Sequence, residues 1–365
     1  MSGLDDLPLR DDLRGQEPYG APQLDVPVRL NVNENPYAPS DSLVEDIGRA
    51  AAAAATQLNR YPDREAWALR LDLAAYVAKR EGVDVEPAQV WPANGSNEVM
   101  HQLFLAFGGP GRTALGFTPT YSMYPEYARD TFTRWVTEPR AHDFTLSPEQ
   151  ARDAVRKHQP VLTVVPSPNN PTGTALQPET LLALLDATSE HQGLVVVDEA
   201  YAEFRRPGTA SALALLHDHP RLVVTRTMSK AFAFAGGRLG YLVADAPVID
   251  AVRIVRLPYH LNAVSQAVAR TALAHADDLL GAVDLLRQER DETVKWLRDK
   301  GFDVADSDAN FVLFGRFDDR HAVWGRLLAR GVLIRETGPD GWLRVSIGTS
   351  DEMSAFKRAL EESTP

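Results

Sequence analysis

Side chains with distinct chemistry follow short apolar runs in the middle of the chain. They include an amine (Lys230), a carboxylate (Asp198), a phenol three residues further on (Tyr201), an amide (Asn170) and a guanidinium (Arg238). A lysine amine can form a Schiff base with an aldehyde, and a carboxylate can pair with a protonated ring nitrogen. This combination suits a flat, phosphorylated ring that contains nitrogen.

Hydrogen-bond donors suited to a phosphate occur in the same part of the chain. A Gly-Ser-Asn triplet precedes a helix-length segment, and the first backbone N–H groups of a helix, together with its dipole, favour an anion. Hydroxyl groups and a fixed positive charge add further hydrogen bonds, while the ring of Tyr121 offers a flat face. The candidate donors are Gly95, Ser96, Asn97, Thr227, Ser229 and Arg238.

Short apolar runs that alternate with helix-length segments must position these side chains. Runs of this length, rich in Val, are typical of strands buried on both faces of a mostly parallel sheet. Ligands of such sheets bind at the carboxyl ends of the strands, where the polar residues occur here. The sequence therefore predicts an α/β fold in which five strand exits converge on one crevice. The expected strands are 89–91, 113–117, 161–165, 194–197, 222–225 and 239–243.

The remaining segments predict an arm, flanking helices and a smaller domain. The first 30 residues are rich in Pro and Asp without a sustained period, which indicates an extended arm. Six consecutive alanines favour a helix over 41–56, and apolar residues every three to four positions favour another around 69–77. We expect three units, namely an arm at 1–30, a large domain at 31–259 and a small α+β domain at 260–365.

The small domain is expected to begin with one long helical stretch, 262–299, and to continue with short strands and a terminal helix. The strands are expected at 311–314, 332–334 and 343–347. The run from Thr349 to Glu352 is typical of a capping box and predicts the start of the last helix.

Composition narrows the class of protein. The 365 residues predict about two domains, and 38 basic against 50 acidic side chains leave a net charge of −12. Such a surface repels nucleic-acid phosphates and anionic membranes on average. The absence of Cys excludes disulfides and thiolate metal sites, and we expect no metal. With no membrane span and no secretory signal in the sequence, we expect a cytoplasmic protein.

Three blocks of the sequence resemble the pyridoxal-phosphate-dependent aminotransferases of fold type I. They are Ser-Pro-Asn-Asn-Pro-Thr-Gly at 167–173, Val-Asp-Glu-Ala-Tyr at 197–201, and Thr-Met-Ser-Lys-Ala-Phe at 227–232 with Gly-Gly-Arg-Leu-Gly-Tyr at 236–241. More narrowly, the segments 18–19, 33–37, 59–62 and 119–124 are similar to those of the histidinol-phosphate aminotransferases. The resemblance runs from about Leu7 to the C-terminal helix and implies a mainly parallel, seven-stranded large sheet.

The resemblance also implies roles for residues that would bind pyridoxal 5'-phosphate. Lys230 would carry the cofactor as a Schiff base and then move protons as the general base. Asp198 would keep the ring nitrogen protonated, so that negative charge developing on the substrate is stabilised where it appears. Asn170 and Tyr201 would hydrogen-bond the phenolic oxygen, and Tyr121 would stack on the ring.

A second group of implied roles concerns phosphate and the partner subunit. Ser96 and Asn97, with Thr227, Ser229 and Arg238, would bind the cofactor phosphate. In the family, the residue matching Tyr61 reaches the phosphate of the neighbouring subunit's cofactor. The resemblance therefore implies a homodimer with shared active sites, and an N-terminal arm that packs on the small domain and on the partner subunit.

At the substrate end, the resemblance implies an anion site. Arg344 matches the family's arginine for the substrate anion, and Arg335 looks like its companion. Two guanidiniums suit a phosphate better than one does, and the same pair can hold the carboxylates of glutamate. Tyr19, Asn33 and Tyr259 match positions that line the substrate pocket. The implied reaction is a ping-pong transamination of histidine biosynthesis, between histidinol phosphate or imidazole acetol phosphate and glutamate or 2-oxoglutarate.

Two alternatives remain open at this point, and a third is disfavoured. An aromatic amino-acid aminotransferase could use the same tyrosines and arginines for phenylalanine. A decarboxylase acting on an amino-acid phosphate could use the same scaffold without 2-oxoglutarate. A cofactor-binding regulator would need an attached DNA-binding module, for which the acidic 30-residue arm leaves no room.

Overall fold

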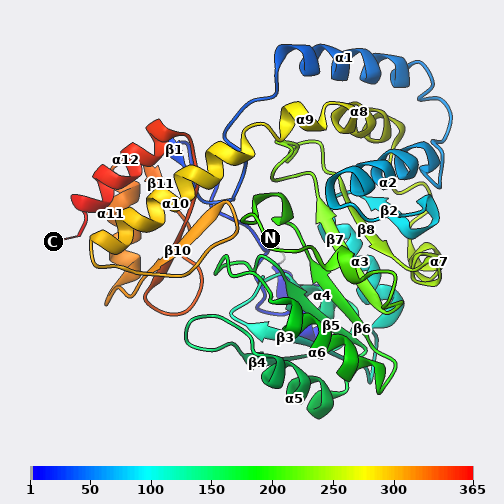
Figure 1. Cartoon of the computed structure of the whole chain (residues 1–365), viewed down its shortest axis with the longest axis horizontal. Coiled ribbons are helices and arrows are strands. Elements are labelled where there is room, and N and C mark those ends of the chain that lie inside the picture. Colours follow the sequence, from blue (N-terminus) through cyan, green and yellow to red (C-terminus); the bar gives the residue numbers. More distant parts are fainter. Residues whose placement is uncertain (1–2, 365) are drawn as a thin grey trace.

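The computed structural model describes residues 3–364 and is built around one seven-stranded sheet (Figure 1). Its strands are β2 (Val90–Ala93), β3 (Thr113–Thr118), β4 (Arg134–Pro139), β5 (Leu162–Pro166), β6 (Leu194–Asp198), β7 (Leu222–Thr227) and β8 (Gly240–Ala244). They lie in the order β2-β8-β7-β6-β5-β3-β4, and only β8 runs antiparallel to its neighbours. The predicted mainly parallel α/β sheet is confirmed, and β2, β3, β5, β6 and β7 all end at the same edge.

Helices cover both faces of this sheet because its strands are apolar on both sides. In β6, Val195 and Val197 belong to the core on one face, whereas Leu194 and Val196 belong to the core on the other. The first face packs against α2 (Trp67–Glu81), α5 (Pro148–His158), α6 (Pro178–Ser189) and α8 (Ala263–Ala274). The second packs against α3 (Ser96–Phe107), α4 (Tyr124–Asp130) and α7 (Ala246–Val255).

Smaller sheets lie beside the large one (Figure 1). Strands β9 (Asp303–Val304), β10 (Phe311–Gly315) and β12 (Trp342–Ser346) form an antiparallel sheet, and β1 (Val28–Arg29) pairs in parallel with β11 (Val332–Leu333). The helices here are α10 (Val283–Asp299), α11 (Arg320–Ala329) and α12 (Ser350–Glu361). The predicted capping box opens α12, since Thr349 Oγ1 accepts from Glu352 N at 3.3 Å and Thr349 N donates to Glu352 Oε2 at 2.8 Å.

One prediction about the elements was wrong, and one strand was missed. The predicted helical stretch 262–299 is interrupted, because α8 ends at Ala274 and a short helix α9 (Ala276–Leu279) and a turn precede α10. The ring of His275 is held at 2.7 Å by Asp46 of α1 (Asp41–Ala55), which fixes this break. The edge strand β4 was not expected, since its half-exposed residues include Arg and Glu. The remaining short elements are 3-10 turns at Leu4–Asp6, Asp11–Leu13, Pro87–Gln89, Ala202–Phe204 and Ala212–Leu215.

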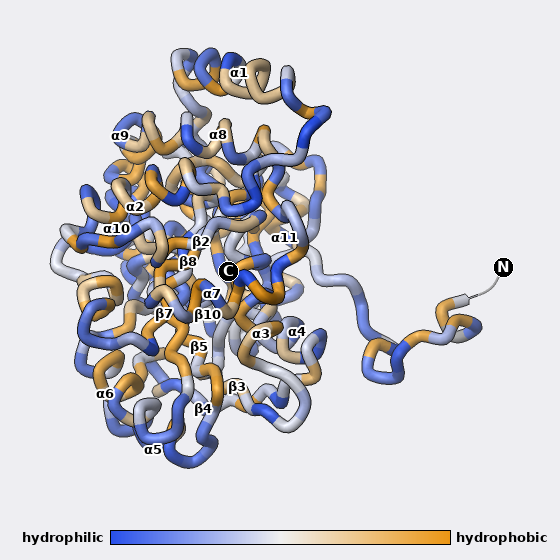
Figure 2. Tube along the Cα trace, turned by 90° about the vertical axis from the view of Figure 1, so that its right-hand side faces the viewer, coloured by the Kyte–Doolittle hydropathy of each residue, from blue (hydrophilic) through white to orange (hydrophobic). Residues whose placement is uncertain are grey.

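The N-terminal arm leaves the body of the protein, as Figure 2 shows. Arg10 ties it to the end of α4, where its guanidinium lies 4.3 Å from the ring centroid of Phe132. Leu4 and Leu7, further out, are largely exposed. Helix α8, at the expected start of the small domain, packs against α1 and α2, and the boundary at residue 260 stays a prediction. Within 3–364, no helix is long and apolar enough to cross a membrane.

Candidate active site

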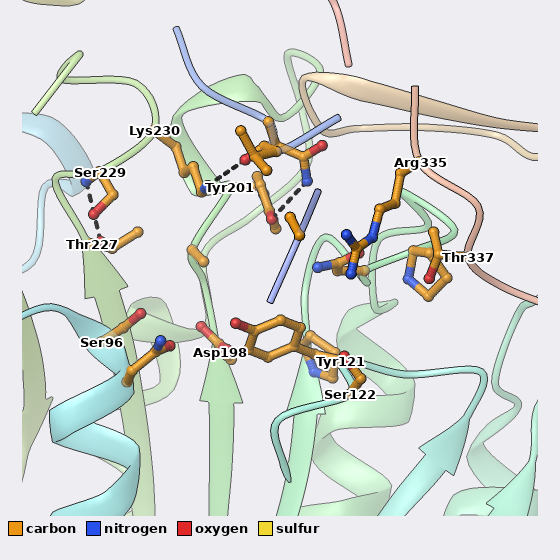
Figure 3. Close-up of a pocket in the computed structure, with 18 of the residues that line it drawn as sticks. Ser96, Tyr121, Ser122, Asp198, Tyr201, Thr227, Ser229, Lys230, Arg335 and Thr337 are labelled. Carbon is orange, nitrogen blue, oxygen red and sulfur yellow. Dashed lines mark hydrogen bonds between the residues drawn. The ribbon is translucent and has the colours of Figure 1, made fainter. Parts of the chain in front are cut away.

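A cavity of about 250 Å³ lies at the edge where the strands of the large sheet end (Figure 3). It is closed from the other side by the N-terminal segment and by residues next to β11 and β12. The structure therefore brings most of the predicted site residues into one space. Those that line it are Tyr19, Asn33, Ser96, Asn97, Tyr121, Asn170, Asp198, Tyr201, Thr227, Ser229, Lys230, Arg238, Arg335 and Arg344.

The amine of Lys230 points into the cavity from the loop after β7. Its Nζ donates to the backbone carbonyl oxygen of Val32 at 2.8 Å (Figure 3). Burial, with a further contribution from the positive charges of Arg344 and Arg238, lowers the pKa of Lys230 to about 8. A substantial share of the amine is therefore uncharged near neutral pH, the form that attacks a carbonyl.

The carboxylate of Asp198 lies at the end of β6, opposite Lys230 in Figure 3. Its Oδ2 accepts from the hydroxyl of Tyr124 at 2.8 Å, and its Oδ1 accepts from Thr225 Oγ1 at 3.1 Å. Burial raises the pKa of Asp198, while these two hydrogen bonds oppose that shift. Because Asp198 also lines the cavity, it can face a ring nitrogen there.

The amides of Asn33 and Asn170 form hydrogen bonds with neighbouring polar side chains of the cavity. Asn33 Nδ2 donates to Tyr201 Oη at 2.9 Å, so the hydroxyl proton of Tyr201 stays available to a ligand. Asn33 Oδ1 in turn accepts from Ser346 Oγ at 2.8 Å. On the other side, Arg344 Nη1 donates to Asn170 Oδ1 at 2.5 Å. The amide nitrogen of Asn170 is then the group that a ligand oxygen can use.

One end of the cavity gathers groups that can bind an anion. Figure 3 shows Ser96, Thr227 and Ser229 together at this end, and Arg238 Nη1 donates to Ser229 Oγ at 3.1 Å. Gly95 caps α3 with φ +85° and ψ 165°, and a Cβ there would lie 2.5 Å from Arg238 Nη2. The glycine thus leaves room for a guanidinium beside the N-terminus of a 12-residue helix, an arrangement that favours an anion.

Two further guanidiniums lie at the opposite end. Arg335 and Arg344 face each other in an antiparallel bridge, with both backbone N–H···O distances at 2.9 Å. Directly opposite residues project from the same face of a sheet, and Arg344 Nε is buried without a hydrogen-bond partner among the described residues. Glu336, the acidic residue next to Arg335 in the chain, pairs with Arg320 and His321.

The two predicted residues Tyr61 and Tyr259 do not line the cavity of their own chain. Their rings stack on each other with centroids 4.3 Å apart, and Tyr61 is 78% exposed. Gly95 does not line it either, because the space beside it is taken by the guanidinium of Arg238. The substrate role of Tyr259 and the phosphate role of Tyr61 stay predictions.

Sequence reasoning missed several polar groups around the cavity. Tyr124 lies within a motif that resembles the family, yet its contact with Asp198 could not be inferred from spacing. Thr225 gave a signal, since a hydroxyl within a buried Val-rich strand needs a partner. Thr120, Ser122 and Thr337 also line the cavity. No group of metal-ligating side chains occurs among residues 3–364.

Known proteins resemble this chain over nearly its full length. Residues 26–360 match the model of the family described as aminotransferase class I and II. A histidinol-phosphate aminotransferase of Thermobifida fusca (strain YX) is 62% identical over 361 residues, covering 99% of this chain and 96% of the relative. A second relative, histidinol-phosphate aminotransferase 3 of Burkholderia lata, is 60% identical over 357 residues. The match covers 98% of this chain and 96% of the relative.

Solved structures agree with this relationship. The histidinol-phosphate aminotransferase from Sinorhizobium meliloti, in complex with pyridoxal-5'-phosphate, has a TM-score of 0.82 at 26% identity and covers 93% of this chain and 91% of its own. Tetra mutant 1 of the Thermus thermophilus aspartate aminotransferase has a TM-score of 0.81 at 26% identity. The match covers 97% of this chain and 98% of the mutant's chain. The predicted fold, reaction class and cofactor are confirmed. The chain belongs to the aminotransferase class I and II family, as a transaminase that depends on pyridoxal phosphate.

Proposed function

We propose that this enzyme is an L-histidinol-phosphate:2-oxoglutarate aminotransferase of histidine biosynthesis. The observation that carries the proposal is the pair of arginines, Arg335 and Arg344, which line the cavity and lie opposite each other in an antiparallel bridge. Figure 3 shows Arg335 at the end of the cavity away from Ser96, Thr227 and Ser229. Two guanidiniums suit a dianionic phosphate better than one does, and they also suit the carboxylates of glutamate. The names of the relatives above support the same substrate, and we propose the cytoplasm as the location.

Bound pyridoxal phosphate supplies an aldehyde for a Schiff base and a ring that withdraws electrons from the substrate. Lys230 Nζ would be the nucleophile that holds the aldehyde and, once a substrate amine has displaced it, the base that moves the proton. Val32 O, at 2.8 Å, orients the amine without neutralising it. Asp198 would face the ring nitrogen, and Tyr121 would lie against the ring, since both side chains line the cavity.

The phenolic oxygen and the phosphate each have their own donors. Tyr201 and Asn170 would donate to the phenolic oxygen, since their other polar atoms are already engaged by Asn33 and Arg344. We propose that Asn33 acts on the substrate indirectly, by orienting Tyr201. The cofactor phosphate would be held by Ser96, Asn97, Thr227, Ser229 and Arg238.

We further propose that the enzyme is a homodimer. Tyr61 and Tyr259 form an exposed stacked pair, and Ile254 and Leu257, which precede Tyr259 closely in the chain, are 83% and 72% exposed. Neighbouring exposed apolar side chains of this size mark an interaction surface. Tyr61 would reach the partner's cofactor phosphate from this surface, and the arm would pack on the partner. Sedimentation equilibrium of the holoenzyme tests the oligomeric state.

The main alternative is an aromatic amino-acid aminotransferase. It is favoured by the rings of Tyr19 and Tyr121, which meet edge to face with centroids 6.5 Å apart. Comparing kcat/KM for histidinol phosphate and for phenylalanine distinguishes the two, and we expect a clear preference for the phosphate. A preference for phenylalanine would overturn the proposed substrate. A single turnover that returns the aldehyde cofactor and releases carbon dioxide would instead indicate a decarboxylase.

A further inference from the structure

The hydroxyl of Tyr124 has no role in the reaction described so far. Tyr124 is fully buried at the start of α4, and its Oη donates to Asp198 Oδ2 at 2.8 Å. The opposite carboxylate oxygen accepts from Thr225 Oγ1 at 3.1 Å, and the backbone N–H of Ala200 adds a third hydrogen bond. All three groups are donors toward the carboxylate.

The carboxylate of Asp198 can accept more hydrogen bonds than these donors provide. An ionised carboxylate accepts about four hydrogen bonds, and the protein fills three of those positions. Asp198 is only 6% exposed, and its remaining exposure is toward the cavity. The position left over therefore faces the place proposed for the ring nitrogen of the cofactor.

One proton would be shared between Asp198 and that ring nitrogen, and the donors to the carboxylate would decide which of the two groups holds it. Each such donor stabilises the ionised carboxylate relative to the acid, which favours the proton on the ring. Tyr124 is suited to this because burial raises its own pKa well above the ordinary value. It stays a neutral phenol and a permanent donor.

The ring of Tyr124 also fixes a second cofactor contact. It meets the ring of Tyr121 edge to face, with centroids 5.5 Å apart at 86°, and lies 6.1 Å from the ring of Trp135. One side chain therefore contacts both the group that faces the ring nitrogen and the group that faces the ring plane.

We propose that Tyr124 is a positioning residue that keeps the shared proton on the cofactor nitrogen by donating to Asp198, with Thr225 as a weaker second donor. The inference rests on the proposed role of Asp198. It predicts that removing the hydroxyl while keeping the ring changes the electronic state of the cofactor more than its placement.

The test uses Tyr124→Phe in the holoenzyme, with the cofactor labelled by ¹⁵N at the ring nitrogen. We expect the ¹⁵N NMR signal to move from the protonated toward the neutral position. We also expect kcat to fall about ten- to a hundredfold, the value of one hydrogen bond to a charged group, with KM for glutamate changing much less. Thr225→Val should shift both readouts in the same direction, but less.

The matched control is Tyr127→Phe. Tyr127 lies on the same helix and is buried, but its hydroxyl has no hydrogen-bond partner among the described residues. This variant should leave the ¹⁵N signal and kcat at wild-type values. Should Tyr124→Phe prove unstable, Thr225→Val carries the same test on its own.

Two results would overturn the inference. One is an unshifted ¹⁵N signal in Tyr124→Phe, whether or not activity is lost, because a loss without a shift would mean that Tyr124 only packs. The other is an equal shift in Tyr127→Phe. Failure of the proposed role of Asp198 would look different, since the wild-type enzyme itself would then show a neutral ring nitrogen.

Discussion

Replacing Gly95 by Ala should weaken the binding of the cofactor phosphate specifically. The added Cβ would lie 2.5 Å from Arg238 Nη2 and 3.2 Å from its Cζ, both at the mobile end of a long side chain. The guanidinium can relieve this clash by moving, but it then leaves its place beside Ser229 and the start of α3. The clash therefore weakens the proposed phosphate site, because it displaces a guanidinium that would bind the phosphate.

The magnitude has two separate parts. Gly95 has φ +85° and ψ 165°, a region that costs an L-residue about 1–3 kcal/mol of folding free energy. Loss of a charge-assisted hydrogen bond to the phosphate costs about 1.5–3 kcal/mol of binding free energy. At about 1.4 kcal/mol per tenfold, the affinity for pyridoxal phosphate should fall roughly ten- to a hundredfold.

The assay is a titration of the apo-protein with pyridoxal phosphate and, separately, with pyridoxal, which lacks the phosphate. Gly95→Ala should lose affinity for the first and keep its affinity for the second. Gly82→Ala is the control, because Gly82 also has a positive φ, +68°, but nothing lies within 4 Å of its Cβ position. It should lose about 1–2 kcal/mol of stability and bind both forms normally.

The reasoning would be refuted if Gly95→Ala bound pyridoxal phosphate as tightly as the wild type. It would also be refuted if the affinities for both cofactor forms fell equally. The double variant Gly95→Ala/Arg238→Ala should bind pyridoxal phosphate as tightly as Arg238→Ala alone does, because both substitutions remove the same contact.

Two further predictions concern the amine and the anion site. Because the pKa of Lys230 is lowered to about 8, the rate at which the apo-protein forms its Schiff base with pyridoxal phosphate should rise with pH through about 8; at pH 7.5 roughly a quarter of the amine is neutral, against about a thousandth for an ordinary lysine. Stopped-flow absorbance measures this rate, and an inflection near the ordinary lysine value would contradict the environment described. Arg344→Ala should slow the half-reactions of both glutamate and histidinol phosphate, since one anion site serves both; single-turnover assays that show a defect with glutamate alone would reassign the residue.

Much of the site was predictable because its residues occur in local blocks. The segments 167–173, 197–201 and 227–241 each follow a strand of the sheet, so placing the strands in one parallel sheet brings the blocks together. The phosphate donors were predictable for the same reason, since a helix start follows β2 directly.

The contacts that orient the site residues were not predictable, because they join parts of the chain that lie far apart in the sequence. Asn33 meets Ser346, 313 positions away, and through this contact holds Tyr201. The carbonyl of Val32 receives the amine of Lys230, 198 positions away. Asn33 lies in the segment 33–37 and was predicted to line the substrate pocket, but no local pattern marks its contact with Tyr201 or the contact of Val32 with Lys230. The edge strand β4 escaped notice because a half-exposed strand lacks the apolar run of a buried one.

Polar residues on the other face of the same strands explain how the site keeps its geometry. Successive side chains of a strand point to opposite faces, so Thr225 and Thr227 face α3 and α4, whereas Arg226 faces α2. There Arg226 Nη2 lies 2.6 Å from Glu199 Oε2, on the loop after β6, and 2.6 Å from Glu81 Oε1 at the end of α2.

This buried network connects the residues that follow Asp198 and precede Thr227. Arg205 adds a second guanidinium, 3.2 Å from Glu81, and Glu203 a third carboxyl, 3.8 Å from Arg226. Burial raises the pKa of Glu203, and the two guanidiniums lie among three carboxyl groups. Removing one partner of such a network leaves an unpaired buried charge. The ends of β6 and β7 therefore cannot shift apart without breaking it, and the distance between Asp198 and the donors on β7 is fixed from the face of the sheet that never meets the substrate.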